Sequence, residues 1–156
     1  MNAPRGHRYN ATVRWTGNTG TGTQTYRGYK RDHVIESGDK PPIAGSSDPH
    51  FRGDDARWNP EELLVASLST CHQLWYLHLC AEAGVVVTTY EDNAEGAMQE
   101  QPDGGAFTRV TLHPRVTIRA GDAHLARELH HRAHALCFIA RSVNFPVECE
   151  PVIETE

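Results

Sequence analysis

The order of the segments along the chain predicts an α+β fold. Strand-like segments, a long helical segment, further strands, a second helical segment and a final strand follow one another along 156 residues. Segregated runs of strands and helices favour an α+β domain over a parallel doubly wound sheet. The length suits one domain with one substantial core, and neither a repeat nor a linker divides it. We therefore expect a single domain over residues 1–156.

The amino-terminal third predicts strands followed by a long loop. His7–Trp15 alternates in polarity like a strand, and the glycine-rich stretch 16–22 predicts a turn. Thr23–Ser37 offers one or two further strands through its Thr, Tyr, Val and Ile residues. Gly38–Trp58 is dense in Gly, Pro, Ser and Asp and predicts a loop of about 20 residues, a length that usually has a function.

The next segment predicts a helix with clear ends. Asn59 is a favoured N-cap, Pro60 suits the first helical position, and the acidic pair Glu61 and Glu62 suits the positive end of the helix dipole. Gly84 ends the helix. The helix is apolar almost all the way round, so it must be covered on every side, and this predicts an obligate dimer.

The carboxy-terminal half predicts strands, a helix and one more strand. Val85–Gln101 and Ala106–Ala120 are expected to be strands on either side of a Pro-Asp-Gly-Gly turn. Gly121–Cys137 is expected to be helical, with Asp122 as its N-cap. Asn144-Phe145-Pro146 then breaks the helical pattern, and residues 147–156 form a short final strand.

Charge and hydropathy exclude several classes of protein. The chain has 15 basic and 20 acidic residues, so it lacks the basic face of a nucleic-acid-binding protein. The amino terminus lacks the apolar core of a signal peptide, and no apolar run approaches the length of a membrane span. We therefore expect no nucleic-acid partner, no membrane association and a cytoplasmic location, where cysteines are rarely structural crosslinks.

Two cysteines occupy matching places in the two apolar helical segments. Cys71 lies near the middle of the first, and Cys137 lies within Leu129–Val143 of the second. Such thiols are core filler, metal ligands, a crosslink or a reaction centre, and a lone buried cysteine is most often filler. Cys80 and Cys149 are interpreted as filler, because nothing polar accompanies Cys80 and Cys149 lies in the terminal strand.

Histidines near these thiols raise the question of a metal site. His130 and His134 recur at helical spacing with Cys137, and His72 adjoins Cys71. Consecutive helical residues point about 100° apart, so Cys71 and His72 do not readily ligate one ion. We expect neither a metal nor a cofactor, and a His/Cys metal-binding protein remains an alternative.

The segment NPEELLVASLSTCH, from Asn59 to His72, resembles the helix start and reactive cysteine of the OsmC/Ohr family of thiol-dependent peroxidases. The segment AHALC, which ends at Cys137, resembles the second cysteine site of that family. Element order and total length agree as well, so the resemblance covers the chain from about Tyr9 to Glu154.

The resemblance implies an intertwined homodimer with antiparallel-rich sheets packed around two central helices and active sites at the dimer interface. It implies that Cys71 attacks a peroxide, that Cys137 resolves the product as an intramolecular disulfide, and that an external dithiol restores both thiols. It assigns Glu61 and an arginine to the same site. Spacing favours Arg52 for the arginine, with Arg57 and Arg31 as alternatives, and Phe138 stands where many relatives have proline.

The chemistry explains why these residue types are needed. A thiolate rather than a thiol cleaves the O–O bond, burial disfavours the thiolate, and a nearby guanidinium favours it. The expected surroundings of Cys71 are apolar and favour an organic hydroperoxide as substrate. They comprise Leu68, Leu74, Trp75, Phe138, Ile139 and Phe51. The rival hypothesis is a non-enzymatic protein of the same fold that binds a small apolar or thiol-reactive ligand.

Overall fold

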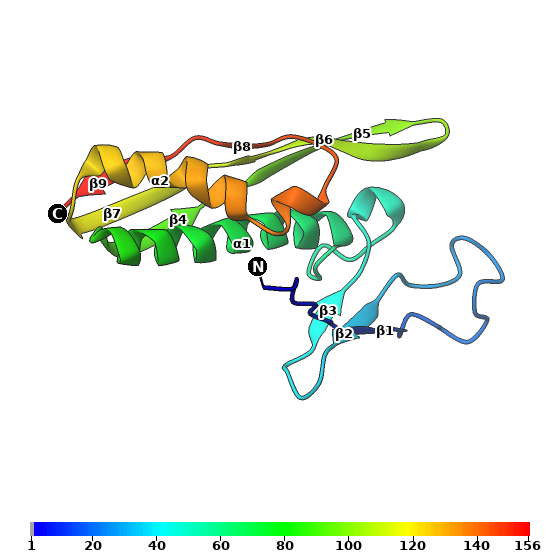
Figure 1. The fold of residues 1–156 in the computed structure, drawn as a ribbon. Coiled ribbons are helices and arrows are strands. Elements are labelled where there is room, and N and C mark those ends of the chain that lie inside the picture. The colour runs from blue at the N-terminus through cyan, green and yellow to red at the C-terminus, as the bar shows by residue number, and fades with distance from the viewer. Residues whose placement is uncertain (1) are drawn as a thin grey trace. The chain divides into compact units, whose positions relative to one another are not determined.

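The computed structural model describes residues 2–156 and confirms the α+β class (Figure 1). The chain forms two compact units, an amino-terminal unit that ends at Glu62 and a carboxy-terminal unit, Leu63–Glu156. The expectation of one domain over residues 1–156 stays a prediction. Within residues 2–156, none of the helices combines the length and the hydropathy that a membrane span needs.

The amino-terminal unit contains one small antiparallel sheet in the order β1-β2-β3. Its strands are β1 (Thr12–Trp15), β2 (His33–Glu36) and β3 (Ile43–Gly45), and a 3-10 helix, η1 (Pro49–Phe51), follows. The strand predicted over His7–Trp15 is therefore confined to its last four residues. The predicted loop Gly38–Trp58 contains β3, because Ile43 pairs with Ile35 of β2 in a tertiary contact that local composition does not reveal.

The carboxy-terminal unit consists of two helices and two three-stranded sheets, ordered β4-β7-β9 and β5-β6-β8. Its helices are α1 (Pro60–Ala83, whose first turn belongs to the amino-terminal unit), α2 (Ala123–Leu136) and the 3-10 helix η2 (Ala140–Ser142). Its strands are β4 (Val86–Asp92), β5 (Glu95–Gln101), β6 (Gly104–Leu112), β7 (Pro114–Ala120), β8 (Val147–Cys149) and β9 (Val152–Thr155).

The two sheets are the two ends of one long, bent hairpin. Strand β4 runs almost directly into β5, β6 runs into β7, and the pairs β4/β7 and β5/β6 are antiparallel (Figure 1). The short strands β8 and β9 add to β6 and β7 in parallel. Asp92 holds the bend, because its carboxylate accepts hydrogen bonds from the Ser69 hydroxyl at 2.5 Å and from the His113 backbone N–H at 2.6 Å.

Both predicted ends of α1 and the predicted start of α2 are confirmed. The Asn59 side chain accepts a hydrogen bond from the Glu62 N–H at 2.8 Å, and Gly84 takes the left-handed conformation (φ 75°) after the last turn of α1. Asp122 caps α2 by accepting hydrogen bonds from the N–H groups of His124 and Leu125 at 2.7 and 3.2 Å.

The placement of Cys137 inside a helix is corrected. It is the C-cap of α2, where the backbone turns to an extended conformation (ψ 114°). The apolar residues after it leave the helix because Ile139 and Val143 pack into a separate core cluster, around Leu68, Val110 and Leu112. Cys137 therefore lies at a corner of the chain rather than on a helix face.

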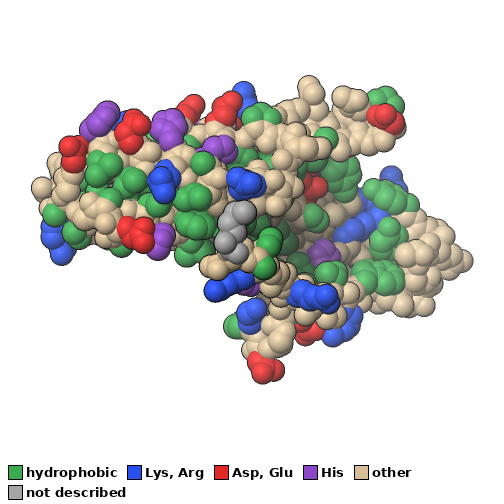
Figure 2. Space-filling model, in the orientation of Figure 1, with side chains coloured by type: hydrophobic (Ala, Val, Ile, Leu, Met, Phe, Trp, Pro, Cys, Tyr) green, Lys and Arg blue, Asp and Glu red, His purple; other side chains and the backbone are tan. Residues whose placement is uncertain are grey.

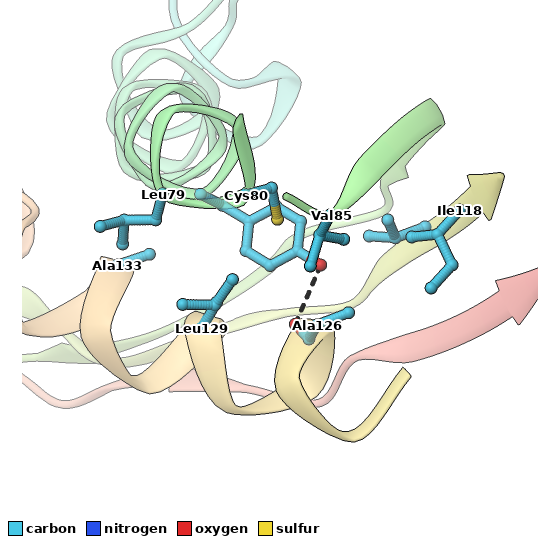
Figure 3. Close-up of a cluster of buried hydrophobic side chains, with 9 residues drawn as sticks. Leu79, Cys80, Val85, Ile118, Ala126, Leu129 and Ala133 are labelled. Carbon is cyan, nitrogen blue, oxygen red and sulfur yellow. Dashed lines mark hydrogen bonds between the residues drawn. The ribbon is translucent and has the colours of Figure 1, made fainter. Parts of the chain in front are cut away.

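A larger core cluster joins α1 and α2 to the sheet of β4 and β7. Tyr76 is completely buried in it and donates a hydrogen bond to the Ala126 carbonyl at 2.9 Å, drawn as the dashed line in Figure 3. The side chains labelled in Figure 3 converge from α1, α2 and the strands. They are Leu79, Cys80, Val85, Ile118, Ala126, Leu129 and Ala133. Cys80 is thus the core filler that the sequence predicts.

Candidate active site: a cysteine pair beside an apolar cavity

Cys71 and Cys137 lie together in the carboxy-terminal unit. Cys71 belongs to α1 and is half-buried, whereas Cys137 at the end of α2 is 1% exposed. The two side chains lie next to each other, and both thiols are free. Two neighbouring reduced thiols can form a disulfide where their Cα atoms lie within about 7 Å of each other.

The environment of Cys137 keeps it protonated. Burial raises the pKa of its thiol to about 11, and the neighbouring Cys71 side chain acts in the same direction. The Ala140 N–H, which donates to the Cys137 sulfur at 3.5 Å, partly opposes this rise in pKa. Cys137 is therefore a protonated thiol rather than a reactive thiolate.

Cys71 opens onto an apolar cavity of about 330 Å³. The cavity is lined by Cys71, Leu74, Trp75, His78 and Phe138. The Trp75 ring meets the Phe138 ring edge to face, with centroids 5.5 Å apart. Its volume is in the range of small-molecule sites. The site can therefore hold a small apolar molecule against the Cys71 sulfur.

The walls of this cavity are exposed hydrophobic side chains. Leu74 is 68% exposed and Phe138 is 66% exposed. Hydrophobic side chains also gather over α1 and α2 in Figure 2, with histidines and charged side chains along the outer edge of α2. Large apolar side chains exposed together mark a ligand or protein contact rather than ordinary surface.

The cavity differs in part from the surroundings expected from the sequence. Leu74, Trp75 and Phe138 line it as expected, but Leu68 is 1% exposed in the smaller core cluster and Ile139 packs against that cluster. His78 also lines it and was missed. The signal was present, because His78 lies seven residues, or about two helical turns, after Cys71 and so shares its face of α1.

The three candidate arginines all belong to the amino-terminal unit, and the guanidinium groups of two of them make hydrogen bonds within it. Arg57 donates to the carbonyls of Gly45 and His33, each at 2.8 Å. Arg31 donates to two backbone carbonyls at 2.6 and 2.7 Å, and its guanidinium lies over the rings of Tyr26 and Tyr29. Both guanidinium groups therefore stabilise their own loops.

Arg52 differs from the other two arginines. It is exposed, and within residues 2–156 its guanidinium has no hydrogen bond or ion pair. It is also the C-cap of η1 with φ 66°, the left-handed conformation that side-chain-bearing residues rarely adopt. Among non-glycine residues 2–156 it alone has a positive φ, and such strain clusters at functional sites.

Glu61 belongs to the amino-terminal unit as well. It is half-buried in the first turn of α1, and its carboxylate has no ion pair or hydrogen bond within residues 2–156. The helix that follows it is continuous to Ala83. A carboxylate at a helix start without a partner remains available to pair with a guanidinium.

Comparisons with known proteins agree with the fold. The family model described as OsmC-like protein matches residues 53–151, which include both cysteines. The chain belongs to the OsmC-like family. A comparison with curated proteins found no match.

Solved structures of OsmC-like proteins resemble this one over nearly its whole length. An OsmC-like protein of unknown function from Vibrio cholerae is 32% identical, with a TM-score of 0.84 and coverage of 94% of this chain and 99% of the other. An organic hydroperoxide resistance protein from Elizabethkingia anophelis is 16% identical, with a TM-score of 0.69 and coverage of 99% and 100%. An organic hydroperoxide resistance protein from Legionella pneumophila is 15% identical, with a TM-score of 0.65 and coverage of 95% and 97%. The last two share the fold.

Proposed function

We propose that this OsmC-like protein is a thiol-dependent peroxidase that reduces organic hydroperoxides to alcohols. The observation that carries the proposal is the contact between the Cys71 and Cys137 side chains beside an open apolar cavity. The sulfenic acid of a single thiol is open to further, irreversible oxidation, whereas a thiol with a second thiol beside it can return through a disulfide. The organic hydroperoxide resistance proteins of the same fold agree with this proposal.

The proposed cycle has three steps. The Cys71 thiolate attacks the terminal oxygen of the hydroperoxide, the O–O bond breaks, and the alkoxide leaves as an alcohol after taking a proton. The resulting Cys71 sulfenic acid condenses with the Cys137 thiol, which releases water and forms the disulfide. An external dithiol then reduces this disulfide by thiol–disulfide exchange and is itself oxidised to a disulfide.

The cavity accounts for the proposed preference for organic substrates. Its lining offers Leu74, Trp75 and Phe138 to the alkyl or aryl group of a hydroperoxide. Burial of apolar substrate surface stabilises binding by roughly 25 cal/mol per Å². Hydrogen peroxide has no such surface, so it gains nothing from these contacts.

Arg52 and Glu61 are proposed to complete the site. Arg52 has the free guanidinium that a thiolate and a developing alkoxide need, and its strained backbone is consistent with a functional position. Glu61 acts through the arginine and not on Cys71 itself, because ten residues of continuous helix span about 15 Å.

Homodimer formation and a cytoplasmic location are part of the same proposal. The exposed Leu74 and Phe138 side chains supply apolar surface that a second copy of the chain can cover. Four free cysteines suit a reducing compartment, where an external dithiol is available. Light scattering that finds a monomer at micromolar concentration contradicts the dimer.

The decisive experiment follows peroxide loss in the presence of a dithiol. Wild-type protein is compared with Cys71→Ser and with Cys80→Ser, whose thiol is buried in the core away from the cavity. We expect turnover of an aryl hydroperoxide in wild type and Cys80→Ser and none in Cys71→Ser. Absence of turnover in the reduced wild-type protein, with retained binding of the hydroperoxide or its alcohol, would establish the non-enzymatic ligand-binding protein instead.

A further inference from the structure

A second cluster of chemically reactive side chains lies within the carboxy-terminal unit. His72 of α1, His130 of α2 and Cys149 of β8 bring one donor atom each to within 4.8 Å of the others. His72 Nε2 is 2.9 Å from His130 Nδ1, and the Cys149 sulfur is 3.8 Å from the first and 3.9 Å from the second. Helical spacing in the sequence placed His130 with His134 and Cys137, whereas the structure places it with His72 and Cys149.

This cluster is separate from the cavity at Cys71. His72 follows Cys71 directly on α1, and consecutive helical residues point about 100° apart. Cys71 lines the apolar cavity, whereas none of His72, His130 and Cys149 does. The two sites therefore use adjacent residues of one helix without sharing a ligand.

The buried histidines are incompletely satisfied by the protein. His72 is 1% exposed and His130 is 2% exposed, and His130 Nε2 is buried without a hydrogen-bond partner within residues 2–156. The two rings are within 4° of parallel, and one nitrogen donates a hydrogen bond to the other. The unpartnered atom is Nε2, whereas Nδ1 is the nitrogen that faces His72 and Cys149, so an ion in the cluster would bind His130 through Nδ1.

The donor atoms have the chemistry and spacing of a transition-metal site. Zinc binds imidazole nitrogen at about 2.0–2.1 Å and thiolate sulfur at about 2.3 Å. With the separations given above, one point satisfies these distances to all three atoms and lies about 0.6 Å out of their plane. Rotation of the two rings, which breaks the bond between them, turns both nitrogen lone pairs toward this point.

Neighbouring groups pack against the site and keep its imidazoles neutral. The Tyr76 ring stacks on the His130 ring with centroids 3.8 Å apart, and Tyr76 is itself held by its hydrogen bond to Ala126. Burial lowers the pKa of His72 to about 4 and that of His130 to about 3, so both imidazoles are neutral at pH 7, which is the form that binds metal. Only the Cys149 thiol must lose a proton when an ion binds.

We propose that His72, His130 and Cys149 bind a borderline divalent cation of the zinc class, with an open fourth coordination position. Two imidazoles and a thiolate select zinc-class ions over calcium or magnesium, which prefer oxygen. His130 and Cys149 also line a cavity of about 370 Å³, which gives an ion access and leaves room for water or another ligand. The ion links α1, α2 and β8, which are distant in sequence.

The test titrates the reduced full chain with Zn²⁺ and with Co²⁺, whose thiolate bonds give a characteristic charge-transfer absorption. It uses the Cys71→Ser background, so that the Cys71/Cys137 pair cannot bind the metal. We expect one equivalent of Zn²⁺ bound at micromolar or lower concentration, a raised Tm, and a cobalt–thiolate band. Adding Cys149→Ser should abolish the band and weaken Zn²⁺ binding at least tenfold. Adding Cys80→Ser, a buried thiol outside the cluster, should change neither.

A second measurement identifies the metal ligands directly and does not depend on how the Cys149→Ser variant folds. X-ray absorption of the zinc-loaded Cys71→Ser protein should show one sulfur and at least two imidazole nitrogens around zinc. The proposal is overturned by an all-nitrogen shell, by no stoichiometric binding, or by a cobalt–thiolate band that survives in Cys149→Ser. A protein that binds no metal at this cluster can still be a peroxidase, because the peroxidase proposal is tested by the turnover that depends on Cys71.

Discussion

The carboxy-terminal unit holds thiols in two contrasting environments. Cys71 and Cys137 touch each other beside an open apolar cavity, whereas Cys149 lies against two buried imidazoles. In the first environment the partner of a sulfur is another sulfur, so oxidation can end in a disulfide. In the second the partners are nitrogen lone pairs, so coordination is the available chemistry. The neighbours of a cysteine, more than the cysteine itself, therefore decide what it can do.

The largest expected effect separates the roles within the cysteine pair. Cys137→Ser removes the resolving thiol, so Cys71 should be oxidised to sulfinic acid after roughly one turnover. The initial burst of alcohol should remain, and steady turnover with a dithiol should fall about 10³-fold or more. Mass spectrometry of the Cys71 peptide follows the oxidation. Full steady turnover in Cys137→Ser, combined with its loss in Cys149→Ser, would assign the resolving role to Cys149.

Arg52→Ala should have the next largest effect. Loss of a charge-assisted donor from a desolvated site slows the reaction by about 10²-fold or more. Stopped-flow measurement of peroxide reduction by the reduced protein checks this. Arg57→Ala is the matched control, because Arg57 is bound to the carbonyls of Gly45 and His33 and should affect stability instead. If Arg57→Ala slows peroxide reduction and Arg52→Ala does not, the activating role belongs to Arg57 instead.

Phe138→Ala should have a smaller effect that depends on the substrate. The Phe138 ring lines the cavity and packs on Trp75, and such an aromatic contact contributes about 0.5–1.5 kcal/mol. We expect kcat/KM for an aryl hydroperoxide to fall up to about tenfold and that for hydrogen peroxide to stay unchanged. An equal fall for both peroxides would mean that Phe138 positions Cys137 rather than the substrate.

The smallest expected effect concerns stability in alkali. The folded protein raises the pKa of Cys137 from about 9 to about 11, so between these values the unfolded chain loses its proton first. The free energy of unfolding should therefore fall as the pH rises from 9 to 11. Cys137→Ala should reduce that fall by on the order of 1 kcal/mol, measured by urea denaturation of reduced protein. Identical slopes in both proteins would contradict this.

Local signals in the sequence account for most of the fold. The caps at Asn59 and Asp122 and the stop at Gly84 are chemical features of single residues, and three of the four ends of α1 and α2 follow them. The strand at Ile43 could not be predicted, because a partner strand creates it. The end of α2 at Leu136 was missed for a similar reason, since Ile139 and Val143 are drawn away from the helix by a distant core cluster.

The sequence indicated some of the reactive side chains and missed others. The sequence pointed to Cys71 and Cys137 through their matching segments. The structure places the two side chains next to each other, and their roles stay predictions. Cys149 was interpreted as filler. It lies beside His72 and His130 because β8 pairs with β6, and the local sequence does not reveal this pairing. Clusters assembled from three separate elements leave no spacing pattern in a sequence. The roles of Arg52 and Glu61 stay predictions.

The consecutive placement of Cys71 and His72 limits how α1 can change its length. Inserting or deleting one residue ahead of Cys71 rotates every earlier position by about 100° and shifts it by about 1.5 Å relative to both sites. Where the change falls between Ser69 and Cys71, Ser69 also loses its hydrogen bond to Asp92 at the hairpin bend. Length variants of this chain should therefore be tolerated in the glycine-rich turn at 16–22 or the hairpin turn at 102–103, and not within α1.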